Sequence, residues 1–436
     1  MDTIFAPSTA AGQAGIAVIR LSGPAVRDVL KSVCHMNDPK PRYAAFSGVF
    51  TPDGDKIDEA IVLFFKGPNS FTGEDVAEIQ CHGSRAVLKE ILAVLSTQPT
   101  CRMAEPGEFT KRAVYNQKMD LTAAEGLIDL IHADTQAQRR WAVRQMGGAL
   151  QKIYDGWRNE LVQALALMEA YIDFPEEEIP DSQLDDIRNR TYNVITQLEQ
   201  HLDDKGRGKR LKDGFSIVLV GAPNVGKSSL MNQLAKRDVA IVSSTAGTTR
   251  DIVEVSMDVA GYPVILADTA GLRETTEEIE GIGIQRALNR IREADFVIAV
   301  GDARDYPQID ATTRQALAEN PHHIVVWNKC DLVSQPLDGI CLCAPSGKGL
   351  DALWNHITQV VVDVMGNGSE VMLTRERYKT ALTDCLASLK RSLTAPALEL
   401  QAEDLRLAAN ALGKITGRVQ VSELFDIIFS TFCIGK

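Results

Sequence analysis

The sequence predicts a multidomain protein that combines an α+β fold with an α/β fold. Its 436 residues are too many for a single hydrophobic core. An apolar run at 217–220 leads into a glycine-rich loop and then a helix, which is how many α/β domains begin. Segments with helical spacing flank this unit on both sides, so we expect a discontinuous helical domain into which the α/β domain is inserted.

Residues 1–118 are predicted to form the α+β domain. Strands are predicted at 15–21, at 60–65 and at 76–80, the last of which alternates with period two, and the residues at 87–95 predict a helix packed on them. No catalytic motif is recognisable in this stretch, but its turn-rich loops are suitable places for binding residues.

The helical domain is predicted in two parts, 119–212 and 365–436. Its helices are expected at 121–131, 141–171, 184–202, 375–393, 398–413 and 421–432. A basic segment at 205–212 leads into the α/β domain, and we interpret it as a solvated linker rather than an RNA contact.

Residues 213–364 are predicted to form the inserted α/β domain. Strand signals recur at 217–220, 264–267, 296–300 and 324–327, with helical or loop segments between them. This rhythm is typical of a parallel sheet.

Composition limits the classes of function. The net charge of −12 argues against a nucleic-acid-binding surface over the whole molecule, although it allows a local basic patch or a basic partner. The eight cysteines contain no C-x-x-C pair, so neither a zinc site nor a disulfide framework is expected. We find no signal peptide and no apolar run long enough to cross a bilayer, so we expect a cytoplasmic chain without a membrane partner.

The loop after the first α/β strand has the pattern G-x-x-x-x-G-K-S, from Gly221 to Ser228. Glycines allow the backbone to wrap phosphate groups, so that main-chain N–H groups and the helix N-terminus face the anion. Lys227 is expected to reach the β- and γ-phosphates, and the Ser228 hydroxyl to bind Mg²⁺. The strand–loop–helix setting favours a nucleotide site over a chance glycine-rich turn.

Further motifs indicate that the nucleotide is GTP. A D-x-x-G sequence from Asp268 to Gly271 follows a strand, where the carboxylate acts on the Mg²⁺ shell and the glycine N–H contacts the γ-phosphate. An N-K-x-D sequence from Asn328 to Asp331 follows another strand. Its carboxylate pairs with N–H donors that guanine has and adenine lacks, so ATP is rejected. Thr249 lies where a first switch closes on Mg²⁺.

Two positions depart from the usual GTPase pattern. Ala344 follows a cysteine where a Ser-Ala pair usually stands, and its N–H is still expected to reach the guanine O6. Leu272 stands where many GTPases carry the glutamine that orients the attacking water, so another group must orient it. The candidates in this stretch are Glu274, Glu277, Glu278 and Glu280.

The predicted GTP-binding residues are Asn224, Val225, Gly226, Lys227, Ser228, Ser229, Ser243, Ser244, Thr245, Ala246, Gly247, Thr248, Thr249, Asp268, Thr269, Ala270, Gly271, Asn328, Lys329, Asp331 and Ala344.

These motifs together resemble the TrmE–Era group of GTPases. The resemblance rests on P-N-V-G-K-S-S-L at 223–230, A-I-V-S-S-T-A-G-T-T-R-D at 240–251 and D-T-A-G-L-R at 268–273. The ending F-S-T-F-C-I-G-K narrows it to the MnmE (TrmE) family of tRNA-modifying GTPases. Further matches extend the resemblance over the whole chain: F-T-G-E-D at 71–75, P-G-E-F at 106–109 and F-P-E-E-E at 174–178.

The resemblance implies GTP hydrolysis stimulated by K⁺, with the cation placed where an arginine finger acts in other GTPases. Glu280 matches the family's catalytic glutamate and would orient the attacking water. The implied metal ligands are Ser228 and Thr249 for Mg²⁺, and Asn224 with backbone carbonyls around Ser243, Thr245 and Thr248 for K⁺.

The resemblance also implies that the N-terminal domain mediates dimerisation and binds 5,10-methylenetetrahydrofolate or 5-formyltetrahydrofolate. Arg20, Glu78, Lys118 and Lys436 match the family's folate contacts. Cations suit the folate carboxylates, and a carboxylate suits the N–H donors of the pterin ring. Without the resemblance, a strand-end salt bridge would be the better interpretation of Arg20.

Cys433 is placed near the one-carbon site by the resemblance, and we include it as a candidate catalytic residue without assigning it a step. A prenylated C-a-a-X ending does not fit Gly435 and a terminal lysine. A cysteine that simply packs remains the alternative.

The implied protein is a homodimer that works with MnmG (GidA), an FAD-dependent partner, in a heterotetramer or larger complex. Together they would add an aminomethyl or carboxymethylaminomethyl group to C5 of the wobble uridine, position 34, of certain tRNAs. FAD is expected on the partner because this chain has no dinucleotide fingerprint. The alternatives are an RNA-binding ribosome-assembly or translation GTPase of the Era type, and a regulatory scaffold that binds no folate.

Overall fold

A computed structural model describes residues 2–174, 182–237, 254–268, 288–335, 337–366, 372–418 and 428–435. The chain divides into two compact units. The first comprises 1–128, 145–162 and 409–436, and the second comprises 129–144 and 163–408. The helices expected in the helical domain are therefore shared between the units.

A six-stranded mixed sheet of order β3-β4-β5-β2-β1-β6 forms the base of the first unit. Its strands are β1 (Thr3–Pro7), β2 (Ala14–Ser22), β3 (Ala45–Phe50), β4 (Lys56–Phe65), β5 (Val76–Gly83) and β6 (Cys101–Met103). Neighbouring strands are antiparallel except β1 and β6. The three strands predicted at 15–21, 60–65 and 76–80 correspond to β2, β4 and β5, which confirms them.

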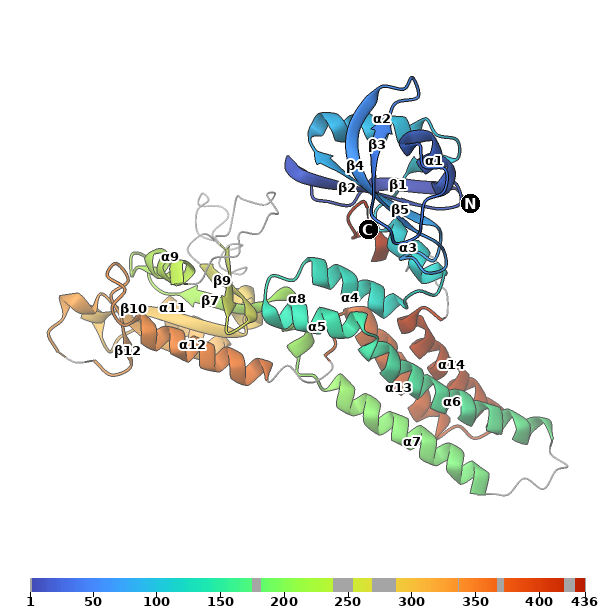
Figure 1. The fold of residues 1–436 in the computed structure, drawn as a ribbon. Coiled ribbons are helices and arrows are strands. Elements are labelled where there is room, and N and C mark those ends of the chain that lie inside the picture. Colours follow the sequence, from blue (N-terminus) through green and yellow to red (C-terminus); the bar gives the residue numbers. More distant parts are fainter. Residues whose placement is uncertain are drawn as a thin grey trace, which may run out of the picture. The chain divides into compact units, whose positions relative to one another are not determined.

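Helices α1 (Val26–Cys34) and α2 (Arg85–Ser96) pack on this sheet (Figure 1). Their apolar side chains share one buried cluster with the strands, in which Leu30 and Ile91 meet Val62 and Ile79. The side chain of Ser84 accepts a hydrogen bond from a main-chain N–H in the first turn of α2 and so caps that helix. Helix α3 (Glu108–Tyr115) follows β6.

The C-terminal residues 428–435 belong to the first unit. Phe429 and Phe432 pack with Leu121 and Ile128 of helix α4 (Leu121–Ile131). At the end of the tail, the Ser8 hydroxyl donates to the Gly435 carbonyl at 2.9 Å.

The remaining long helices follow the predicted spacing, with two corrections. They are α5 (Gln136–Met146), α6 (Ala149–Asp173), α7 (Ser182–Leu202), α13 (Glu376–Ser392) and α14 (Leu398–Thr416). The single helix predicted at 141–171 is wrong, because Gly148 adopts a left-handed φ of 78° and separates α5 from α6. The solvated linker predicted at 205–212 is also wrong. It contains α8 (Arg207–Asp213), in which Gly208 and Leu211 are buried. Most of the helix predicted at 421–432 lies outside the described residues.

The second unit contains a six-stranded sheet of order β12-β11-β10-β7-β9-β8. Its strands are β7 (Phe215–Val220), β8 (Glu254–Val259), β9 (Tyr262–Asp268), β10 (Phe296–Asp302), β11 (His323–Asn328) and β12 (Ile340–Cys341). Helices α9 (Lys227–Arg237), α11 (Ala311–Glu319) and α12 (Leu350–Met365) lie around it (Figure 1). All residues of β10 are buried, as expected for a central strand.

The parallel arrangement predicted for the strands at 217–220, 264–267, 296–300 and 324–327 is confirmed, and the sheet contains one further strand of opposite direction. Strand β8 runs antiparallel to β9 at the edge of the sheet. The two strands are joined by Ala260 and Gly261, which both have positive φ, as a two-residue hairpin requires. The other five strands are parallel, so their carboxyl ends meet at one edge. The multidomain α+β and α/β class is confirmed.

Among the described residues, no helix combines the length and apolar character needed to traverse a lipid bilayer.

Candidate functional site

The phosphate loop lies between β7 and α9, as the motif predicts. Gly226 has a φ of 100°, and a Cβ added to it would lie 2.3 Å from Nδ2 of Asn328, so only glycine fits. Asn224 adopts a left-handed φ of 61°, which asparagine tolerates better than most residues. The Lys227 ammonium donates to the carbonyls of Gly221 and Ala222 at 2.9 and 3.0 Å. The cation is therefore held over the loop where phosphates are expected.

Two of the three residues predicted to act on Mg²⁺, Ser228 and Asp268, lie side by side. Ser228 begins α9, and Asp268 ends β9, the strand next to β7. The Ser228 hydroxyl donates to Oδ2 of Asp268 at 3.0 Å, and Asp268 is only 4% exposed. A hydroxyl and a carboxylate are hard oxygen ligands, which is the donor set that Mg²⁺ prefers. These residues fit a magnesium ion.

Asn328 joins the phosphate loop to the guanine loop. Its side chain is almost fully buried at the end of β11. Its Nδ2 donates to the Val225 carbonyl at 2.7 Å, and its Oδ1 accepts from the Ala344 N–H at 3.0 Å. The N–H predicted to meet guanine O6 is therefore engaged with Asn328 in this structure.

Lys329 completes this junction. It has a left-handed φ of 64°, and its ammonium donates to the Asn224 carbonyl at 2.8 Å and to Oδ2 of Asp302 at 2.9 Å. The Arg304 guanidinium, and after it Lys329, hold the pKa of Asp302 well below its ordinary range. Asp302 therefore stays anionic and fixes Lys329 over the loop.

Sequence reasoning missed Asp302. The available signal was its place at the carboxyl end of β10, which is parallel to β11 and directly beside it. Asp331 follows in a short 3-10 turn, where its side chain is exposed to solvent. Several predicted residues lie outside the described part of the chain: Ser243, Ser244, Thr245, Ala246, Gly247, Thr248, Thr249, Thr269, Ala270, Gly271 and Glu280.

Two of the predicted folate residues face each other across strands β2 and β5. Arg20 is the register partner of Glu78. Its guanidinium donates to Oε1 of Glu78 at 2.8 and 3.1 Å, and both side chains are about one-fifth exposed. The guanidinium also lies 5.4 Å from the centroid of the Phe71 ring. Arg20 thus makes the strand salt bridge that was its alternative interpretation, and it fixes the Glu78 carboxylate.

Lys118 lies beside the loop that carries the F-T-G-E-D sequence. Its ammonium donates to the Pro68 carbonyl at 2.9 Å, and Asn116 donates to the Thr72 carbonyl at 2.7 Å. Within the loop, Glu74 accepts from the Ser22 hydroxyl at 2.6 Å. These bonds attach the loop to β2 and to the end of α3.

A partly buried ion network at α3 is absent from the sequence-based expectations. Arg112 donates to Asp2, Glu74 and Glu108 at 2.9 to 3.2 Å. Burial alone would raise the pKa of Glu108, but the bonds from Arg102 and Arg112 lower it below its ordinary value. The P-G-E-F sequence was the only signal, and it looked like a turn. Glu108 is in fact the first residue of α3.

The tail brings Cys433 to the P-G-E-F segment. The Gly107 N–H donates to the Cys433 carbonyl at 3.4 Å, and the Cys433 side chain is exposed. A Cβ on Gly107 would lie 2.7 Å from the Phe429 carbonyl, so the tail packs directly against this turn. Lys436 lies outside the described residues.

Comparison with known proteins identifies the family. The model for the GTP-binding protein TrmE N-terminus matches residues 3–118, and the model for the MnmE helical domain matches residues 121–433. Proteins named tRNA modification GTPase MnmE from Paramagnetospirillum magneticum, Parvibaculum lavamentivorans and Rhodospirillum rubrum are 46%, 47% and 45% identical to this chain, with 100% of each chain covered. The chain belongs to the MnmE family.

Membership of the MnmE family covers both units, since the two family models together span residues 3–433 with only two residues between them. Among solved structures, the FeoB G domain from Methanococcus jannaschii is 24% identical over 34% of this chain and 97% of its own. Its TM-score of 0.26 is too low to support a conclusion.

Proposed function

We propose that this chain hydrolyses GTP, with K⁺ as activator, as part of tRNA modification in the cytoplasm. With an FAD-dependent partner, MnmG, it would add an aminomethyl or carboxymethylaminomethyl group to C5 of the wobble uridine, position 34, of certain tRNAs. A tetrahydrofolate would donate the carbon, and the chain would act as a homodimer. The observation that carries the proposal is the Asn328 bridge between the phosphate loop and the guanine loop, in a chain of the MnmE family.

The positions of the described residues support the proposed nucleotide binding. Lys227 exchanges its two carbonyl partners for phosphate oxygens, which are the stronger acceptors because they are charged. Ser228 and Asp268 would hold a Mg²⁺ ion, which would offset charge that develops on the phosphate oxygens. Asp331 pairs with the N–H donors of guanine and so excludes ATP. Asn328 holds the phosphate loop and the guanine loop together while the nucleotide binds.

Hydrolysis requires residues beyond the described part of the chain. Glu280 orients the attacking water in place of the glutamine replaced by Leu272, and Thr249 adds to the Mg²⁺ ligands. Asn224 is exposed on the phosphate loop, where its side-chain oxygen is available to a monovalent cation. Such a cation stabilises the negative charge of the transition state, as an arginine finger does in other GTPases.

The folate site is proposed on the first unit. Glu78 accepts from the pterin N–H groups, while Lys118 and Lys436 meet the folate carboxylates. Arg20, which donates to Glu78 at 2.8 Å, is proposed with it as a folate contact. The bond between the Gly107 N–H and the Cys433 carbonyl supports the proposal that Cys433 belongs to this site.

Hydrolysis assays test the nucleotide part. GTP is expected to be cleaved much faster in KCl than in NaCl, with no cleavage of ATP. Glu280→Ala is expected to retain GTP binding and nearly abolish cleavage. Equal rates in the two salts would remove the Asn224 cation site from the proposal, and weakened GTP binding by Glu280→Ala would make that residue structural.

Titration with 5-formyltetrahydrofolate tests the folate part. Saturable binding is expected for the wild-type chain, with weaker binding after Glu78→Gln. Absence of binding, together with intact GTP hydrolysis, would favour an RNA-binding switch or a scaffold over a modification enzyme.

A further inference from the structure

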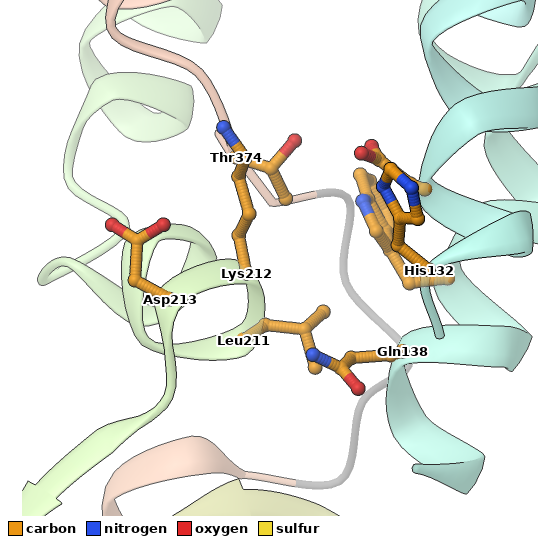
Figure 2. A pocket seen from close by; sticks show the side chains of 8 residues that line it. His132, Gln138, Leu211, Lys212, Asp213 and Thr374 are labelled. Carbon is orange, nitrogen blue, oxygen red and sulfur yellow. The ribbon is translucent and has the colours of Figure 1, made fainter. Parts of the chain in front are cut away.

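A cavity in the second unit lies apart from the nucleotide site. It has a volume of about 210 Å³ and is walled by α4, α5, α8 and Thr374, which precedes α13. Figure 2 shows His132 and Gln138 on one side of the cavity and Leu211, Lys212 and Thr374 on the other. The space is larger than the roughly 30 Å³ that one water molecule occupies in the liquid.

Two buried atoms at this cavity that can donate a hydrogen bond have no partner among the described residues. They are Nε1 of Trp141 and Oγ1 of Thr374. Each side chain is only 5% exposed, so solvent does not replace the missing partner. An unpaired buried donor is destabilising. Because the indole N–H can only donate, an occupant that satisfies Trp141 must present an acceptor.

The remaining polar groups in the wall are of both kinds: the carboxylates of Asp129 and Asp213 are acceptors, whereas Gln138 and Lys212 contribute donors. Oδ1 of Asp129 accepts from the Arg375 guanidinium at 2.7 Å, so the charge of this carboxylate is already compensated. Oε1 of Gln138 accepts from two main-chain N–H groups at 3.0 Å, which leaves its NH₂ group as donor. Lys212 adds an ammonium group, and Asp213 lies away from the α5 wall in Figure 2. This donor set matches a compact, negatively charged oxygen compound.

The wall formed by α8 is firmly anchored. A Cβ on Gly208 would lie 2.1 Å from the Leu373 carbonyl, so α8 packs directly against the chain that leads to Thr374. Arg210 donates to Asp295 at 2.6 Å, and Asp295 also accepts from the main-chain N–H of Ser216 at 2.9 Å. Ser216 lies on β7, the strand that leads into the phosphate loop. The cavity is therefore a built feature, and one of its walls is bonded to the nucleotide sheet.

We propose that this cavity binds a small oxyanion, either a carboxylate or a phosphate. The Trp141 indole N–H and the Thr374 hydroxyl donate to its oxygens, and the Lys212 ammonium offsets its charge. The site is separate from the phosphate loop, and it does not depend on the function proposed above.

The indole N–H signals of the full-length chain, labelled with ¹⁵N-tryptophan, test this directly. The chain has four tryptophans, so three signals serve as internal controls. The protein is first saturated with GDP and Mg²⁺, which fills the phosphate loop. Sodium phosphate and sodium acetate are then added separately, with NaCl keeping the ionic strength constant. We expect the signal that Trp141→Phe removes to shift saturably. A shift with phosphate alone identifies a phosphate site, and a shift with acetate alone identifies a carboxylate site.

Thr374→Val removes the second donor with little change in volume. We expect this variant to fold as well as wild type, because the hydroxyl has no partner to lose, and to bind the anion roughly tenfold or more weakly. Thr312→Val, on the exposed surface of α11, is the matched control and should bind as wild type. If neither anion shifts the Trp141 signal, the cavity holds only water and the proposal is wrong. An unchanged affinity in Thr374→Val would also overturn it.

Discussion

The nucleotide site and the contacts of the C-terminal tail (residues 428–435), here called the tail site, are assembled in opposite ways. The nucleotide site uses residues that follow neighbouring parallel strands of one sheet, so Ser228, Asp268 and Asn328 meet at a shared edge. The tail site depends on contacts between the two ends of the chain, as in the bond from Ser8 to Gly435, which are 427 residues apart. In the first case local motifs determine the geometry, whereas in the second only the tertiary fold does.

This difference determines how each site should fail. Residues of the nucleotide site are proposed to contact bound nucleotide, so their loss should affect catalysis directly and leave the first unit intact. Residues of the tail mainly position one another. Their loss should lower stability and folate binding together, while the nucleotide site keeps its activity.

The largest expected effect comes from Lys227→Ala. Removing a cation from the developing phosphate charge is expected to slow GTP hydrolysis by roughly 10²- to 10³-fold. The measurement is the rate of phosphate release under saturating GTP. Lys236→Ala, an exposed lysine on the same helix, is the matched control and should retain the wild-type rate. Binding of 5-formyltetrahydrofolate should be unchanged in both variants, and its loss in Lys227→Ala would mean that the two sites are not independent.

A smaller effect is expected from Gly435→Ala. This glycine has a φ of 97°, and a Cβ would lie 2.0 Å from the Pro7 carbonyl. The left-handed backbone alone costs roughly 1–2 kcal/mol for other residues. If that cost falls on the docked tail, folate affinity should fall by about 5- to 30-fold, as measured by titration, while GTP hydrolysis is unchanged.

Gly54→Ala is the matched control for this change. Gly54 has a similar φ of 92°, but nothing lies within 4 Å of an added Cβ. It should therefore show the backbone cost in thermal unfolding without loss of folate affinity. Equal folate loss in both variants would attribute the effect to general instability rather than to the tail.

The same contrast explains what the sequence could predict. Phosphate-binding and guanine-binding motifs are short, and each follows a strand, so Lys227, Ser228, Asp268 and Asn328 were placed correctly in the fold from spacing alone. The partners that hold them were harder to find. Asp302 carries no motif, and its role depends on the neighbouring strand that brings Lys329 to it.

Irregular segments were predicted less well. The break at Gly148 and the helix α8 both depend on a few residues whose conformation is set by packing. The basic residues in 205–212 suggested a solvent-exposed segment, whereas Gly208 in its middle is buried against the Leu373 carbonyl. In the first unit, Arg20 and Glu78 were selected by resemblance, and only the register of β2 and β5 showed that they bind each other.

The smallest expected effect concerns the thiols, and it separates the two regions by chemistry. Burial raises the pKa of Cys34 and Cys385 to about 12, while burial and then the neighbouring Cys341 raise the pKa of Cys330 to about 11. Only the thiolate reacts with iodoacetamide, so at pH 8 a thiol of pKa 12 is about one ten-thousandth ionised. Cys433 is exposed, so the first label per chain should fall on it, as mapped by peptide mass spectrometry. Raising the pH toward 11 should ionise Cys330 and allow iodoacetamide to label it.

Cys433→Ser should remove this first, fast labelling phase, and labelling of the wild type should leave GTP hydrolysis unchanged. If the fast phase instead falls on Cys330, inside the N-K-x-D sequence, and abolishes nucleotide binding, the guanine loop would be the more open of the two regions.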